Sequence, residues 1–128
     1  MMKAIYIHHV SLTVSNLKRA KAFYRDIICL EEIKRPDFGF EGAWFRIGEG
    51  QLHLIVDETL PQNSQSIIDT RGPHFALRVD DYYKTVEWLK QKEVKIVEKP
   101  NSRSGFAQIF CCDPDRNIIE LHVEQKQG

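Results

Sequence analysis

Four side chains that can bind a metal ion recur at corresponding places in this chain: His9, His53, His74 and Glu120. Each lies in a short segment that alternates apolar and polar residues, a pattern typical of a half-buried β-strand. Successive side chains of a strand point to opposite faces, so each of the four would lie on the face opposite the apolar core. Three imidazoles and one carboxylate suit a divalent ion such as zinc, iron or nickel. The spacing therefore predicts a metal site.

The strength of this prediction comes from the repetition, because a single histidine on an amphipathic strand is more often a solvated or hydrogen-bonded side chain. A subset of three, His9, His74 and Glu120, makes a set of two histidines and one carboxylate. Such a set leaves coordination positions open for substrate. His53 is then either a fourth ligand or a neighbouring acid or base.

The elements that must position these residues are predicted twice along the chain. His9, Leu12 and Val14 match His74, Leu77 and Val79 at an offset of 65, and His53 matches Glu120 at an offset of 67. Periodicity and turn residues predict one order of elements in both halves, β-α-β-β-β. The expected strands are 5–14, 31–34, 43–47, 51–56, 74–79, 94–97, 106–111 and 117–123. The expected helices are 17–28, capped by Ser15 or Asn16, and one that ends near residue 92, capped by Asp80 or Asp81.

Composition bounds the class of protein. The chain has 128 residues, of which 42% are hydrophobic and 28% charged, as in an ordinary globular domain. Its 18 basic and 18 acidic residues cancel, and this removes the simplest argument for nucleic acid or an anionic membrane as a partner, since both demand a basic footprint. We therefore expect no nucleic-acid and no membrane partner, and a small molecule or another protein instead. The absence of an apolar leader or spanning run predicts a cytoplasmic protein.

The three cysteines predict no metal or disulfide framework. Cys29, Cys111 and Cys112 are odd in number and lack the Cys-x-x-Cys spacing. If they lie on a strand, the adjacent Cys111 and Cys112 point to opposite faces and do not share one ion. We expect small apolar fillers in a reducing compartment.

Four stretches together resemble one known family: residues 9–17, 22–26, 72–80 and 113–121. They resemble the vicinal oxygen chelate superfamily, which includes glyoxalase I, bleomycin-resistance proteins, fosfomycin-resistance thiol transferases and extradiol dioxygenases. The resemblance covers nearly the whole chain. It implies an α+β fold in which two tandem βαβββ modules form a U-shaped cleft of mixed sheets around a divalent metal. The expected domain is 5–124, with modules 5–57 and 72–124 joined by a linker, 58–71.

By this resemblance the metal positions are His9, His53, His74 and Glu120, and Glu120 is also the catalytic base. The cofactor implied is one divalent ion: Zn, Ni, Fe, Co or Mn. His53 departs from glyoxalase I, which usually has glutamate there, so one negative charge and one proton acceptor are lost. Arg116 stands where glycine is usual in the turn, and a left-handed backbone there would be costly.

The substrate-binding candidates are the residues expected on the polar face or its rim: Thr13, Arg46, Arg78, Phe106 and His122. Arg78 could hold a carboxylate or a thiol-conjugate anion, or pair with a surface acid. The polar linker is a candidate lid.

Three classes of function follow from the resemblance. The first is a metal-dependent glyoxalase-like lyase or isomerase that acts on a small carbonyl or thiol adduct, with Glu120 moving the proton. The second is a dioxygenase or thiol transferase on the same metal site. The third is a drug- or metabolite-binding protein, which the full set of potential ligands disfavours. The resemblance also implies a homodimer.

Overall fold

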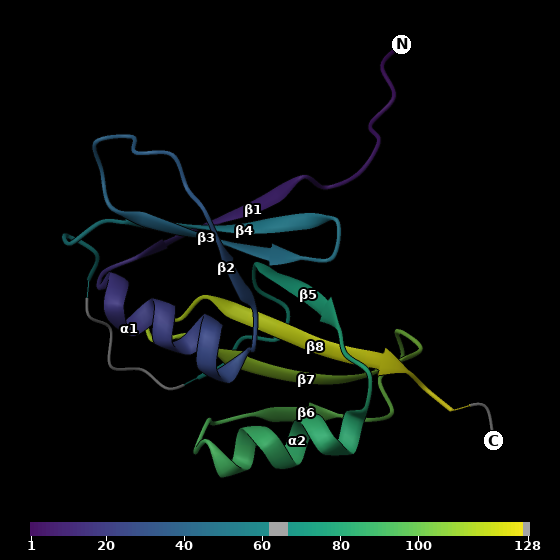
Figure 1. The fold of residues 1–128 in the computed structure, drawn as a ribbon. Coiled ribbons are helices and arrows are strands. Elements are labelled where there is room, and N and C mark those ends of the chain that lie inside the picture. The colour runs from purple at the N-terminus through teal and green to yellow at the C-terminus, as the bar shows by residue number, and fades with distance from the viewer. Residues whose placement is uncertain (62–66, 127–128) are drawn as a thin grey trace. The chain divides into compact units, whose positions relative to one another are not determined.

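The computed structural model describes residues 1–61 and 67–126. It divides the chain into two compact units, Met1–Gln62 and Asn63–Gly128, each with one four-stranded mixed sheet and a helix (Figure 1). The predicted α+β class with two βαβββ modules is thereby confirmed.

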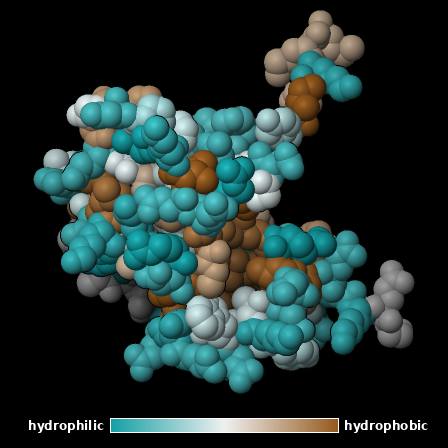
Figure 2. Space-filling model, viewed as in Figure 1, coloured by the Kyte–Doolittle hydropathy of each residue, from teal (hydrophilic) through white to brown (hydrophobic). Residues whose placement is uncertain are grey.

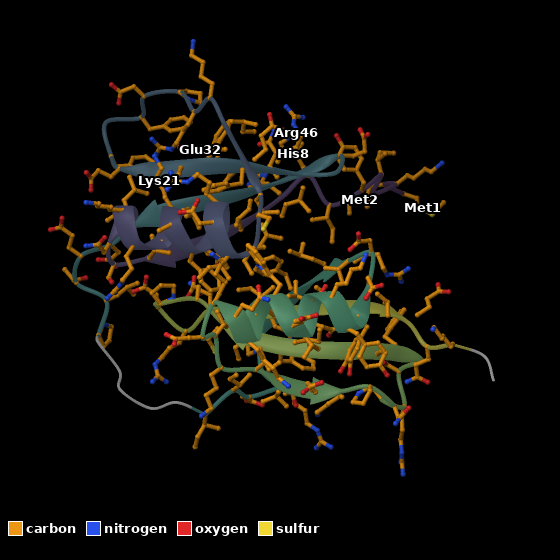
Figure 3. The ribbon with its side chains drawn as sticks, turned by 60° about the horizontal axis from the view of Figure 1, so that its bottom comes forward. Met1, Met2, His8, Lys21, Glu32 and Arg46 are labelled. Atoms are coloured by element: carbon orange, nitrogen blue, oxygen red, sulfur yellow. The ribbon has the colours of Figure 1, made fainter. Side chains whose placement is uncertain are left out.

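The first module runs through six elements: β1 His9–Val14, α1 Leu17–Ala22, the π-helical turn η1 Phe23–Ile27, β2 Glu31–Ile33, β3 Gly42–Ile47 and β4 Gly50–Val56. The strand order is β1-β4-β3-β2. β1 runs parallel to β4, and the other neighbours are antiparallel. An ion pair of 3.0 Å between Lys21 and Glu32 ties α1 to β2 (Figure 3).

The second module repeats this plan: β5 His74–Arg78, α2 Tyr82–Gln91, β6 Val97–Lys99, β7 Phe106–Cys112 and β8 Ile118–Glu124. Its strand order, β5-β8-β7-β6, matches that of the first module, again with one parallel pair. In both modules the strand that carries the later metal-capable residue is therefore central. A central strand holds that side chain between two hydrogen-bonded neighbours.

Local sequence explains where the helices begin. Asn16 accepts a hydrogen bond from the Arg19 backbone N–H at 2.9 Å, and Asp81 accepts one from Lys84 at the same distance. These side chains satisfy amide groups that the first turn leaves unpaired. Of the expected caps, Asn16 and Asp81 are the ones used.

The core of each module lies between its sheet and its helix. Its members are the apolar residues that alternate with the polar ones along the strands, together with one face of each helix. In the first module they are Val14, Ala20, Phe23, Tyr24, Ala43, Phe45, Leu52 and Leu54; in the second they include Val86, Leu89, Ala107, Ile109, Ile119 and Leu121. Burial of this apolar area is the main stabilising contribution to each module.

A tight turn sets the register of β8. Buried Asp113 accepts hydrogen bonds from the backbone N–H groups of Asp115 and Asn117, both at 2.9 Å, and from the Asn117 amide at 2.8 Å. Arg116 takes the left-handed conformation, with φ of 69°. The turn places Cys112 opposite Ile118, and this register fixes the face on which Glu120 lies.

Two expectations about strands were wrong at their edges. The first strand begins at His9 and not at Ile5: Met1 and Met2 stand out from the module, and Ile5, Tyr6 and Ile7 expose their side chains, although the His8 carbonyl accepts a hydrogen bond from the Gln51 backbone N–H (Figures 2 and 3). The strand expected at 94–97 is β6, which begins only at Val97. In both cases the strand begins at the first residue that pairs with a neighbouring strand, His9 opposite Gln51 and Val97 opposite Phe110.

The helix expected over residues 17–28 also differs, because it changes from α to π geometry at Phe23. Of the expected linker 58–71, residues 62–66 lie outside the described residues. No helix in the described ranges is long and apolar enough to cross a membrane.

Candidate metal centre

The polar face of the first sheet carries His9, His53 and Trp44. The register pairs Ser11 with His53 and Trp44 with His53, so β1, β4 and β3 present these side chains on one face. His9 is exposed, whereas the His53 residue is only 9% exposed. Because Trp44 and His9 lie on neighbouring strands, they flank the buried His53.

These three rings form one stack. The His9 and His53 centroids are 4.1 Å apart with an interplanar angle of 15°, and Trp44 and His53 are 4.1 Å apart at 5°. An imidazole binds a metal through a lone pair in its ring plane, at roughly 2.0–2.1 Å for zinc. Two nearly parallel rings at this separation cannot both direct that lone pair at one ion. This conformation favours the alternative in which His53 supports His9.

Hydrogen bonding leaves one ring nitrogen of His9 available to bind a metal ion or another partner. The Nδ1 atoms of His8 and His9 are 2.9 Å apart, so the Nε2 of His9 is the remaining donor or ligand. The Nε2 of His53 lies 2.8 Å from Oε1 of Gln51. Burial, and then the positive charges of His9, His8 and Arg35, lower the pKa of His53. His53 is therefore a neutral, buried ring at neutral pH.

The polar face of the second sheet joins its residues by hydrogen bonds. The Nε2 of His74 lies 3.1 Å from Oε1 of Glu120, and the Nδ1 of His122 lies 2.7 Å from Oε2. Glu120 is buried, with 5% of its surface exposed. Both carboxylate oxygens thus have a histidine partner.

The hydrogen bonds of His74 test whether a metal fits here. Its Nδ1 lies 2.8 Å from the carbonyl oxygen of Gly72, so that nitrogen carries the proton. A neutral imidazole has one N–H only, and its Nε2 then presents a lone pair toward the carboxylate of Glu120. Two lone pairs that face each other repel, so either a second proton or a cation must lie between Nε2 of His74 and Oε1 of Glu120. A histidine that donates one ring N–H to a carbonyl and turns its other nitrogen toward a carboxylate oxygen has the arrangement of a metal ligand, so the pair fits a divalent ion.

The environment of Glu120 keeps it ionised. Burial raises the pKa of this carboxyl, but hydrogen bonds from His122, Gln108 and His74 outweigh burial and hold the pKa below its ordinary value. An ionised carboxylate with a low pKa is a good ligand for a cation. It is a poor base, since it binds a proton weakly near neutral pH.

The predicted substrate residues fall into two groups. In the second module, the Phe106 and His122 rings stack at 4.4 Å, and the Arg78 guanidinium lies 5.5 Å from the Phe106 centroid. Arg78 also pairs with Glu124 at 3.8 Å. In the first module, exposed Arg46 pairs with Glu31 at 3.7 Å, and Thr13 is exposed on β1. The structure brings Arg78, Phe106 and His122 together, and their binding role stays a prediction.

Within residues 1–61 and 67–126, no group of three or more His, Cys, Asp or Glu side chains is already arranged to hold a metal ion. Within its own module, His9 lies beside His53, and His74 lies beside Glu120. Sequence reasoning missed Gln108, which hydrogen-bonds Glu120. Its position on the same strand face as Phe106 and Phe110 was the signal that could have found it.

The match to a family model covers residues 6–121, which is nearly the whole chain. The family is the Glyoxalase/Bleomycin resistance protein/Dioxygenase superfamily, and the chain belongs to it. The identification agrees with the paired modules and with the metal-capable residues on the polar strand faces.

Relatives that are named for different activities match the chain. The metallothiol transferase FosB of Staphylococcus epidermidis is 29% identical over 125 residues, covering 95% of this chain and 84% of the relative. A probable lactoylglutathione lyase of Arabidopsis thaliana is 27% identical over 88% of this chain but 34% of its own length. The solved structure of the fosfomycin resistance protein FosX of Listeria monocytogenes has a TM-score of 0.71 and 22% identity, with 95% and 93% coverage, and shares the fold.

Proposed function

We propose that this protein is a metal-dependent enzyme that adds a thiol to a small electrophilic substrate held through neighbouring oxygens. Its products are a thioether and an alcohol. In this reaction the thiolate sulfur forms a bond to carbon, the carbon–oxygen bond breaks, and the departing oxygen takes a proton from solvent. The superfamily includes several reactions, and we propose this one for the chain.

The single observation that carries the proposal is the environment of Glu120. Both oxygens face histidine nitrogens, at 3.1 and 2.7 Å, and the hydrogen bonds hold the pKa of the carboxyl low. An isomerase of this family would need that carboxylate to collect a proton from carbon. Thiol addition needs only a ligand there, and an ionised, hydrogen-bonded carboxylate suits a ligand better than a base.

The residues that would hold the ion are His9, His74 and Glu120. A bound divalent cation would supply Lewis acidity toward the substrate oxygens. The chain's own residues do the rest: Gly72 fixes the ring orientation of His74 through its carbonyl, and His122 orients Glu120. His53, stacked between Trp44 and His9, would hold the His9 ring in place.

The relatives support the same choice. The match to FosB, a metallothiol transferase by name, covers 95% of this chain and 84% of that protein, whereas the match to the lactoylglutathione lyase covers 88% of this chain and 34% of that protein. The lyase keeps isomerase chemistry as a second candidate. Glyoxalase I usually has a glutamate at the position of His53, so this chain has one proton acceptor fewer for isomerase chemistry.

The test is a pair of assays on protein loaded separately with Zn, Ni, Mn, Fe or Co. Fosfomycin with cysteine or glutathione tests thiol addition, and the hemithioacetal of methylglyoxal and glutathione tests isomerisation. We expect thioether formation with one of the metals and its loss in Glu120→Gln. Glu87→Gln, which changes an exposed acid on α2, serves as the control. Isomerisation without thiol addition would contradict the proposal.

We also propose that the enzyme is a homodimer that acts on small molecules. Light scattering on the purified protein checks this, with an expected mass of twice 14.9 kDa. A monomer at micromolar concentration would contradict it.

A further inference from the structure

A basic cavity lies at the β6 edge of the second module. It has a volume of about 480 Å³ and is lined by Arg71, Lys99, Pro100, Asn101, Ser102 and Arg103. Three of these residues are cations and none is an acid, in a chain whose net charge is zero. The lining comes from two segments that are far apart in sequence, so the fold brings this charge together. The volume is within the range of small-molecule sites.

The nearest carboxylate that contacts the lining is that of Asp69, which accepts a hydrogen bond from the Arg71 backbone N–H at 3.0 Å. Lys99 donates a hydrogen bond from Nζ to Oγ1 of Thr70 at 2.8 Å, a neutral partner. Among the residues that the structure describes, neither Arg71 nor Arg103 has an ion pair with a carboxylate. Like charges gathered without counter-charges raise the local potential, and an anion lowers it.

One lining residue of the cavity, Lys99, lies on the same sheet face as Glu120. Lys99 pairs with Gln108, and Gln108 pairs with His122, so these residues lie on one face of the sheet. The ammonium of Lys99 lies 5.8 Å from the Phe110 ring, which in turn contacts His74 edge-on at 5.4 Å. Two strand spacings separate β6 from β8, roughly 10 Å.

We infer that this cavity binds an oxyanionic group, a carboxylate or a phosphoryl group, on the ligand whose other end reaches His74 and Glu120. The inference rests on the proposed function for that other end. Arginine matches such groups with two parallel hydrogen bonds, and lysine adds a point charge. The ligand would then carry a chelating end and an anionic end roughly 10–15 Å apart, because β6 lies two strands from β8 and three strands from β5.

The experiment uses the full chain, stripped of metal, and titrates it with inorganic phosphate and with malonate at low ionic strength. The variant is Arg71→Gln with Arg103→Gln. The matched control is Lys84→Gln with Lys92→Gln, which removes the same charge from the α2 side of the module. Calorimetry or amide chemical shifts report binding, and both doubly substituted proteins are first checked for the wild-type melting temperature.

We expect the wild type to bind at least one probe, the cavity variant to bind it about tenfold more weakly, and the control to change less than about twofold. Stronger binding of phosphate points to a phosphoryl ligand, and stronger binding of malonate to a carboxylate. Equal binding by wild type and cavity variant would overturn the inference, as would no binding of either probe by the wild type. Because the protein is metal-free, these results do not depend on whether the proposed metal chemistry is correct.

Discussion

The two modules place metal-capable residues at corresponding points of their sheets and hold them by different interactions. In the first, His9 and His53 stack ring on ring beside Trp44. In the second, His74 and Glu120 meet through a hydrogen bond, and both carboxylate oxygens have partners. Stacking fixes ring planes but supplies no charge, whereas the second arrangement concentrates negative charge at one buried atom pair. The second module therefore holds its metal-capable pair by electrostatic interactions, and the first holds its rings by stacking.

The largest expected effect comes from breaking the second module's pair. His74→Ala and Glu120→Gln should each weaken divalent metal binding by more than about 100-fold, because each removes a direct ligand. Isothermal titration calorimetry with zinc or manganese measures this. Wild-type affinity in either variant would show that the pair is not part of the site.

A smaller effect is expected from the first module's stack. Trp44→Leu and His53→Leu should weaken metal binding by about 10-fold, since they remove support for His9 and not a ligand. The conservative Trp44→Phe retains a flat ring and should stay near wild type. A loss in His53→Leu as large as that in His74→Ala would assign His53 as a ligand.

The pH dependence of stability separates the modules further. Burial and nearby positive charge lower the pKa of His53 in the folded chain below its ordinary value of 6.5, so the unfolded chain binds the proton first. Stability of the metal-free protein should therefore fall as the pH drops below about 6.5. Glu120, with its pKa lowered from 4.5, loses its stabilising contribution only in more acidic solution. Urea denaturation across this range measures both windows.

The matching variant is His53→Gln, which should flatten the pH dependence near 6.5 and leave the acidic window unchanged. If the slope near 6.5 persists in His53→Gln, the titrating group lies elsewhere.

The smallest effect is expected at the turn before β8. Arg116 has φ of 69°, a conformation that costs a non-glycine residue about 1 kcal/mol. Arg116→Gly should thus stabilise the protein by up to about 1 kcal/mol, less the entropy that glycine loses on folding. Thermal unfolding measures this shift, with Glu93→Gly, another left-handed residue in the same module, for comparison. A lower melting temperature in Arg116→Gly would mean that the arginine side chain stabilises the turn.

Much of this arrangement follows from local sequence. Alternation along β1, β4, β5 and β8 predicted which side chains share a face, because a strand's period of two needs no knowledge of its partners. The caps at Asn16 and Asp81 were also predictable from local sequence, because capping depends on the residue type at the start of the helix. The left-handed cost at Arg116 followed from its place in a turn where glycine is usual.

The rest depends on pairing between distant segments. The stack of His53 on Trp44 requires the β3–β4 register, and the contact of Gln108 with Glu120 requires that of β7 and β8. Arg71 and Arg103 share a cavity only once the chain is folded. None of these pairings is visible in a single strand's pattern.

X-ray absorption spectroscopy of the bound metal tests the central claim most directly. The wild-type protein, loaded to about one divalent ion per chain, should show two imidazole ligands and one carboxylate, from His9, His74 and Glu120. Three imidazoles would make His53 a ligand and contradict its supporting role. Failure to retain any metal after loading would contradict the proposed metal site itself.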